Sequence, residues 1–246
     1  MRIDQFLFIN GYAESRTEAK NLVLSGAVTL KNKPVTKPSF DIAMDETEVF
    51  VKKAESLFAS RGGYKLLGAL RDFKIDVSGK FAIDIGASSG GFTDCLLQNG
   101  AAHVIAVDSG KMQIKDFLRR DGRVTVIENY NARYMKSEDF EYIPNLAVMD
   151  VSFISATYII PRVYELLSES SDFICLIKPQ FEVGRAALSK GGIVKDEKYR
   201  KMAIDRVCGS AKSVGFDCIS VVKSDILGGD GNIEYLAHFR KNGGTV

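Results

Sequence analysis

One stretch constrains the fold more than any other: residues 81–94, which read FAIDIGASSGGFTD. A short apolar run breaks into small residues and restarts with helical spacing, as in a buried parallel strand that turns into a helix beside a ligand. The glycines at 86, 90 and 91 let a bound molecule approach the backbone closely. Their spacing is not the Gly-x-Gly-x-x-Gly pattern of dinucleotide sites, so the turn does not predict a nicotinamide site.

A second apolar run, residues 104–107, ends in Asp108. This carboxylate follows the glycines by about 20 residues, the distance at which nucleotide-binding folds place the group that binds ribose hydroxyls. The two stretches together favour a cofactor that contains adenosine but no pyrophosphate, which points to S-adenosylmethionine. The alternative is a glycine-rich turn in some other α/β protein.

From residue 60 onward, strand and helix patterns alternate. Helices are predicted at 65–73 and 195–212, and strands at 81–85, 103–107, 124–127, 146–150, 172–178, 217–222 and 233–239. Such alternation predicts an α/β fold, a mainly parallel Rossmann-like sheet with helices on both faces and a ligand site beyond the carboxyl ends of its strands.

A small α+β unit precedes this sheet. Two helical segments are followed by strands at 27–30 and 48–51, with a polar turn at 31–34. Residues 1–40 hold six Lys or Arg against three Asp or Glu, a local excess of positive charge that suits phosphates. We predict a small domain at 1–55, a linker at 56–61 and a large domain at 62–246.

Composition narrows the class of protein. A chain of 246 residues with 46% hydrophobic residues can bury the cores of one large and one small domain. The four cysteines form no Cys-x-x-Cys pair and there are only two histidines, so we predict no metal site and a reducing compartment, the cytoplasm. No apolar run approaches the ~18 residues of a membrane span.

Four ionisable residues lie where such a sheet presents side chains to its ligand site: Lys65, Asp150, Lys178 and Glu234. One lysine at a strand end is usually a surface group. Two ammonium groups at the same edge are tolerated only when carboxylates accompany them. The four residues therefore predict a catalytic site.

The chemistry of this set suits an alcohol nucleophile. A ribose hydroxyl must lose its proton as it attacks a methyl group, and a lysine accepts a proton only when burial and a neighbouring cation favour its neutral form. We expect Lys178 to be the base or steering group and Lys65 to be the neighbouring cation. Asp150 and Glu234 are expected to orient the two ammonium groups.

These residues resemble the Lys-Asp-Lys-Glu tetrad of the FtsJ (RrmJ-like) ribose methyltransferases. The supporting motifs are SRGGYKL at 60–66, the glycine turn, DVSFIS at 150–155, LIKPQFEVGR at 176–185 and GNIE at 231–234. The front segment resembles the RNA-binding domain named after ribosomal protein S-four, which implies that it grips structured RNA. The whole chain resembles the TlyA family, haemolysin-like ribosomal RNA (cytidine-2′-O)-methyltransferases.

The resemblance implies a set of cofactor contacts and a set of RNA contacts. The S-adenosylmethionine site is expected to comprise Asp84, Gly86, Ser88, Ser89, Gly90, Gly91 and Phe92, with Asp108 at the ribose and Glu128 and Asn129 at the adenine. Candidate RNA contacts are Arg2, Ser15, Arg16, Lys20, Lys31, Lys33, Lys37, Arg61, Arg133 and Arg185.

Three functions remain open at this point. The first is a methyltransferase that acts on ribosomal RNA, with the large subunit favoured because the chain has short termini and the small subunit as a possibility. The second is a non-catalytic RNA-binding assembly factor that keeps the fold as a scaffold. The third is a membrane-active haemolysin, as the historical family name suggests. The sequence does not specify the modified nucleotide, the assembly state of the substrate or the oligomeric state.

Overall fold

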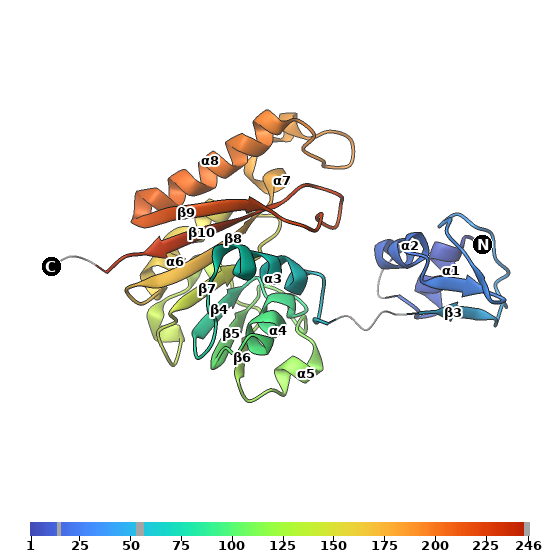
Figure 1. Cartoon of the computed structure of the whole chain (residues 1–246), viewed down its shortest axis with the longest axis horizontal. Helices are drawn as coiled ribbons and strands as arrows, with labels where there is room; N and C mark the ends of the chain where they lie inside the picture. The colour runs from blue at the N-terminus through green and yellow to red at the C-terminus, as the bar shows by residue number, and fades with distance from the viewer. Residues whose placement is uncertain (14–15, 53–56, 244–246) are drawn as a thin grey trace. The chain divides into compact units, whose positions relative to one another are not determined.

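Two helices and a small antiparallel sheet make up the first part of the chain. The computed structural model describes residues 1–13, 16–52 and 57–243, and its contacts divide it into the units Met1–Leu57 and Phe58–Val246 (Figure 1). The predicted linker begins at Ser56, which lies outside the described residues, as does Ser15. The predicted domain limits at 55 and 62 stay predictions.

The small unit packs its helices on one face of its sheet. The helices are α1 (Ile3–Ile9) and α2 (Arg16–Leu24), and the sheet has the order β2-β1-β3, with β1 at Val28–Leu30, β2 at Lys33–Pro34 and β3 at Val49–Val51. Ile3, Leu7, Val23 and Val28 are fully buried between them. The predicted polar turn at 31–34 is partly wrong, because Lys31 and Asn32 take positive φ values of 49° and 62° and fold Lys33–Pro34 back onto β1.

The large unit is built on a seven-stranded sheet with the order β6-β5-β4-β7-β8-β10-β9. Its strands are β4 (Phe81–Ile85), β5 (His103–Val107), β6 (Val124–Ile127), β7 (Leu146–Met149), β8 (Ser171–Ile177), β9 (Phe216–Lys223) and β10 (Tyr235–Lys241). The first five are parallel, whereas β10 runs antiparallel to both β8 and β9. The predicted α/β class is confirmed.

Helices cover both faces of this sheet (Figure 1). On one face lie α3 (Gly62–Phe73) and α4 (Gly91–Gln98), and on the other α6 (Ile160–Leu166) and α8 (Glu197–Val214). Side chains along a strand alternate between the faces, so Ala82 packs with the α3 and α4 layer and Ile83 with the α6 and α8 layer. The central strands β7 and β8 are buried along their whole length because both of their faces are covered.

Shorter helices connect some of the strands. These are α5 (Asp116–Arg119) after β5, and α7 (Pro179–Glu182), which follows β8 directly. Pro179 suits the first position of α7 because a helix start needs no amide hydrogen there.

The last strand begins two residues later than the sequence predicts. It was expected at 233–239, but pairing with β8 begins at Tyr235, opposite Ile177. The reason is Asn232, whose side chain accepts from Val194 N at 2.9 Å and donates to Gly192 O at 3.1 Å. These bonds keep residues 231–234 in a loop at the edge of the sheet, where Glu234 directly precedes the strand.

Candidate active site

The site lies where neighbouring parallel strands end. Gly86 follows β4, Asp150 follows β7 and Lys178 follows β8, and these three strands are adjacent in the sheet. Asp150 N donates to Ile85 O at 2.9 Å, so Asp150 comes directly beside the end of β4. Residues far apart in the sequence therefore meet at one edge because parallel strands share a direction.

The amine of Lys178 is held by the segment that follows β7. Its Nζ lies 2.5 Å from Asp150 Oδ1 and donates to Ser152 Oγ at 2.7 Å. Only 12% of the Lys178 side chain is exposed. Since an ammonium has three protons, these contacts fix its direction and leave it able to bind a further acceptor.

A second ion pair lies deeper. Lys65, in the first turn of α3, donates to Glu234 Oε2 at 2.5 Å, and the side chains are 9% and 2% exposed. Gly228 gives Glu234 its space, because a Cβ at that position would stand 2.3 Å from Glu234 Oε1. A buried ammonium is tolerated only with such a partner. The sequence prediction did not say which acid holds which lysine.

Three of the four predicted catalytic residues line one cavity of about 290 Å³. Its lining residues are Ser60, Arg61, Gly62, Lys65, Gly86, Ala87, Ser88, Ser89, Gly91, Phe92, Asp150, Ser152 and Lys178. The fourth, Glu234, does not line it and lies against Lys65. The glycine turn and both lysines thus border the same space, which is what transfer of a group between a bound donor and a hydroxyl requires.

A larger cavity of about 1100 Å³ adjoins the first and shares Gly86, Ser88, Asp150 and Ser152 with it. Its lining includes Asp108 and Gln113 together with several aromatic and cationic side chains. These are Tyr130, Arg133, Phe153, Tyr158, Phe181, Arg185 and Arg206. The space is large enough for a nucleoside-sized cofactor together with part of a substrate.

The glycine turn approaches its surroundings so closely that side chains are excluded. Gly86 has φ +83°, and a Cβ there would stand 2.4 Å from the main-chain oxygen of Asp150. At Gly91 a Cβ would stand 2.1 Å from Ser60 Oγ. The turn therefore presents backbone to the smaller cavity, the arrangement that a bound adenosine-type cofactor needs.

Asp108 lines the larger cavity and organises the turn beside it. Its Oδ2 accepts from Ser88 N at 2.8 Å and its Oδ1 accepts from Gly110 N at 2.7 Å. Each carboxylate oxygen has a second lone pair, so both can still accept from the two hydroxyls of a ribose. The residues present therefore fit the ribose end of S-adenosylmethionine.

Two other predicted cofactor residues support the site without lining either cavity. Asp84 is fully buried and accepts from Thr93 Oγ1 at 2.7 Å, and burial raises its pKa to about 7. Burial opposes the ionisation of Glu128 as well, yet bonds from Ile114 N, Arg119, Gln113 N and Met112 N lower its pKa to about 2. Glu128 therefore holds the loop at 112–114, which borders the cofactor side of the larger cavity.

The remaining predicted residues are distributed as follows. Neither Gly90 nor Asn129 lines a cavity. Gly90 packs against Leu118. Asn129 has φ +57°, and its main-chain amide donates to Gly110 O. Arg61 lines the smaller cavity and Arg133 and Arg185 line the larger one.

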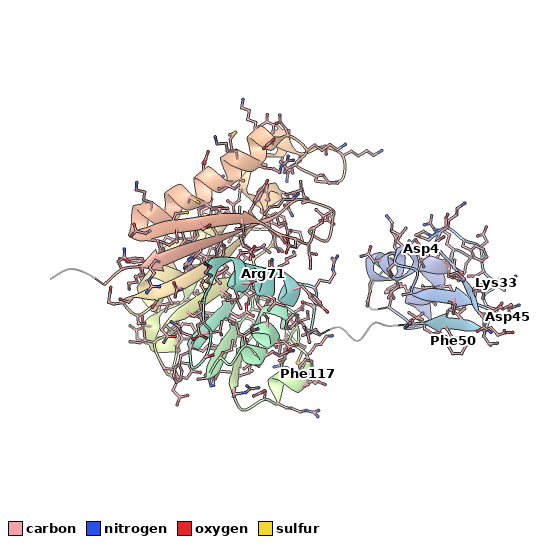
Figure 2. All side chains as sticks on the ribbon, viewed as in Figure 1. Asp4, Lys33, Asp45, Phe50, Arg71 and Phe117 are labelled. Carbon is pink, nitrogen blue, oxygen red and sulfur yellow. The ribbon has the colours of Figure 1, made fainter. Side chains whose placement is uncertain are left out.

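The predicted RNA contacts of the small unit lie on its surface. Arg2 forms two hydrogen bonds to the buried Asp4, and Arg16 lies 3.7 Å from the same carboxylate. Lys31 pairs with Glu46 at 3.4 Å. Lys20, Lys33 and Lys37 are exposed, as Figure 2 shows for Lys33. The structure thus brings cations to the surface of this unit, and their role in RNA binding stays a prediction.

Sequence reasoning missed two residues of the site. Ser152 bonds Lys178, and Phe153 is 92% exposed with φ +63°, a conformation that an aromatic residue rarely takes. The ring of Phe153 lies 5.3 Å from that of Phe181. Both residues fall within the motif DVSFIS, but an aromatic residue there reads as core, and nothing in the letters indicates its exposure.

Comparison with known proteins then identifies the family. Residues 58–241 match the model described as "FtsJ-like methyltransferase", and residues 1–47 match the "S4 domain". The chain belongs to the FtsJ-like methyltransferase family. The resemblance to this family and to TlyA proteins, inferred from the motifs, is confirmed.

Relatives cover nearly the full length of this FtsJ-like chain. Hemolysin A of Brachyspira hyodysenteriae is 41% identical over 97% of this chain and 99% of its own. The 16S/23S rRNA (cytidine-2′-O)-methyltransferase TlyA of Mycobacterium tuberculosis is 38% identical over 97% and 89%. A solved structure described as a hemolysin-type protein from Streptococcus thermophilus is 40% identical, with a TM-score of 0.80 over 98% of this chain and 88% of that one.

No group of three or more His, Cys, Asp or Glu side chains in residues 1–13, 16–52 and 57–243 is arranged to hold a metal ion. No helix among those residues is long and apolar enough to cross a membrane.

Proposed function

We propose that this protein transfers the methyl group of S-adenosylmethionine to the ribose 2′-hydroxyl of a cytidine in ribosomal RNA, with the large-subunit RNA as the favoured substrate. The observation that carries the proposal is the meeting of Lys178, Asp150 and Lys65 at one cavity beside the glycine turn. The names of the curated relatives support the substrate class. The cytoplasm, where ribosomal RNA of bacterial relatives is found, is the proposed location.

The chain's own residues perform the proton chemistry in this proposal. When bound, S-adenosylmethionine supplies an electrophilic methyl group on sulfur. Lys178 Nζ accepts the proton of the 2′-hydroxyl through its lone pair as the hydroxyl oxygen forms its bond to the methyl group, while Asp150 and Ser152 fix the direction of the amine. Lys65 lines the same cavity, and Glu234 holds it in place.

The RNA side of the site is built from exposed aromatic and cationic groups. Phe153 presents its ring at the larger cavity, where an unpaired base can stack on it. Arg133 and Arg185 line the same cavity and suit the phosphates on either side of that base. The S4-type unit adds sequence-independent backbone contacts. A non-catalytic scaffold would have no need of one buried and one half-buried lysine–carboxylate pair at the cofactor edge.

The direct test is methyl transfer to ribosomal RNA. Purified protein with labelled S-adenosylmethionine is incubated with large-subunit RNA, small-subunit RNA and assembled subunits, and the modified ribose is mapped by its resistance to alkaline cleavage. We expect label at a cytidine 2′-oxygen, chiefly in large-subunit material. Label on a base, or S-adenosylmethionine binding without transfer to any of these substrates, would contradict the proposal.

Charge reversal on the small unit should weaken RNA binding without touching the cofactor site. In the full chain, Lys20→Glu, Lys33→Glu and Lys37→Glu together remove three exposed cations. We expect the Kd for ribosomal RNA at low salt to rise about 10–100-fold, and its salt dependence to become shallower, because fewer counterions are released. Filter binding over a salt series measures both.

The matched control reverses three exposed lysines of α8, Lys198, Lys201 and Lys212. The Kd for S-adenosylmethionine should stay unchanged in both triple variants. Equal effects on RNA binding in the two sets would mean that the small unit has no particular role.

A further inference from the structure

Glu182 is a buried acid that the proposed chemistry does not use. It is the last residue of α7 and is 4% exposed. Its Oε2 accepts from Ser155 Oγ at 2.6 Å and its Oε1 accepts from Ala156 N at 2.7 Å. Both donors belong to residues 150–158, which follow β7 and which we call the β7 loop. Glu182 therefore binds this loop through both of its carboxylate oxygens.

The β7 loop carries three residues of the candidate active site. Asp150 and Ser152 contact the amine of Lys178 at one end of the loop, and Phe153 stands at the cavity in its middle. The partners of these residues lie on the segment 178–182. Lys178 is the partner of Asp150 and Ser152, and Phe181 is the partner of Phe153. The loop and this segment are thus joined by the lysine at one end and by Glu182 at the other.

The conformation between these two attachments is an unfavourable one. Phe153 has φ +63° and its ring is largely exposed, so neither local preference nor burial keeps it in place. Such a conformation persists only where the surroundings impose it. The bonds to Ser155 and Ala156 lie two and three residues beyond Phe153, close enough to impose it.

We propose that Glu182 is a positioning residue that fixes the β7 loop, so that Asp150 and Ser152 direct the amine of Lys178 and Phe153 presents its ring to the substrate. Glu182 touches neither the cofactor site nor the reacting hydroxyl. Arg206, which donates to the main-chain oxygen of Glu182 at 2.8 Å, ties the same residue to α8 and so to the main body of the unit. The effect of Glu182 on the reaction rests on the proposed methyl transfer, whereas its hold on the β7 loop does not.

The absence of tryptophan from the sequence allows a direct readout of the loop. In a Phe153→Trp background the single tryptophan reports its own mobility and solvent contact by fluorescence anisotropy and acrylamide quenching, and no catalysis is needed. Adding Glu182→Ala should lower the anisotropy and raise the quenching constant about twofold or more. Adding Glu182→Gln should leave both near the background values.

The amide is expected to rescue because it keeps both bonds. Its oxygen accepts from Ala156 N, and its NH₂ donates to Ser155 Oγ, which then donates to Thr157 Oγ1, already 2.7 Å away. A role that depended on the negative charge would not be rescued. The comparison of Ala with Gln thus separates positioning by hydrogen bonds from an electrostatic effect.

Kinetics with native Phe153 extend the test to the reaction. Glu182→Ala should lower kcat about 30–100-fold with the Kd of S-adenosylmethionine within twofold, and Glu182→Gln should retain most of kcat. Glu165→Ala, at an exposed acid of α6, is the control and should change neither. Unaltered fluorescence and kcat in Glu182→Ala would overturn the proposal, as would equal losses in the Ala and Gln variants.

Two outcomes separate this proposal from its background. If Glu182→Ala fails to fold, Ser155→Ala removes one of the two bonds and the tryptophan readout decides: increased quenching supports positioning, and unchanged quenching overturns it. If no variant or parent transfers a methyl group, the proposed function fails, while the fluorescence still shows whether Glu182 fixes the loop.

Discussion

Replacement of Lys178 by Ala is expected to lower the rate of methyl transfer by about 10²–10⁴-fold, the range that a positioned base supplies. Its amine lies 2.5 Å from Asp150 and donates a hydrogen bond to Ser152, so the β7 loop holds this amine at the cavity. Binding of S-adenosylmethionine should change little, because the ribose and glycine-turn contacts remain. Single-turnover rates and calorimetric Kd values measure the two effects separately.

Lys178→Arg sharpens this test. A guanidinium keeps the positive charge but does not lose a proton in proteins, so it can steer a hydroxyl and cannot accept its proton. We expect Arg to be nearly as inactive as Ala, with Lys212→Ala, on the exposed surface of α8, as the unaffected control. Substantial turnover in Lys178→Arg would reduce the lysine to a steering group, and full turnover in Lys178→Ala would exclude it from the reaction.

Lys65→Ala should have the largest effect on stability. It leaves the Glu234 carboxylate, 2% exposed, without its cation, and the loss of one partner of a buried pair costs about 3–5 kcal/mol. The free energy of unfolding of the large unit, followed by circular dichroism in urea, measures this cost. Activity should fall too, because Lys65 lines the same cavity as Lys178.

The pair can be examined by a double-mutant cycle. Lys65→Met together with Glu234→Gln removes both charges, so the double variant should be more stable than Lys65→Met alone. Arg162→Ala is the surface control, since its pair with Glu165 is largely exposed and is worth about 0.2–1 kcal/mol. A cost for Lys65→Ala no greater than that of the control would show that the pair is not needed for folding.

Much of the fold follows from patterns that local physics explains. The strands at 81–85, 103–107 and 124–127 match the structure because each is a short, mainly apolar run rich in β-branched residues. Residues after parallel strands meet at one edge, so the convergence of Asp150 and Lys178 could be expected. The bounds of the last strand could not, because a side chain, Asn232, binds backbone groups some 40 residues earlier.

The details of the site depend on packing that no local pattern encodes. Which acid pairs with which lysine follows from the order β8-β10 and the direction of β10, and Lys65 and Glu234 are 169 positions apart. Glu182 reads as an ordinary polar residue after an apolar strand, and only the path of the β7 loop makes it a partner of Ser155. Phe153 could not be predicted either, because a phenylalanine is usually buried and this one is exposed.

The antiparallel direction of β10 has a consequence for biosynthesis. This strand lies between β8 and β9 and is synthesised after both. The residue directly before it, Glu234, therefore joins an active site whose other residues were synthesised earlier. A chain that stops short of residue 234 lacks the carboxylate that pairs with Lys65 and the strand that joins β9 to β8. The Lys65–Glu234 pair and the complete sheet therefore form only after nearly the whole chain has been synthesised.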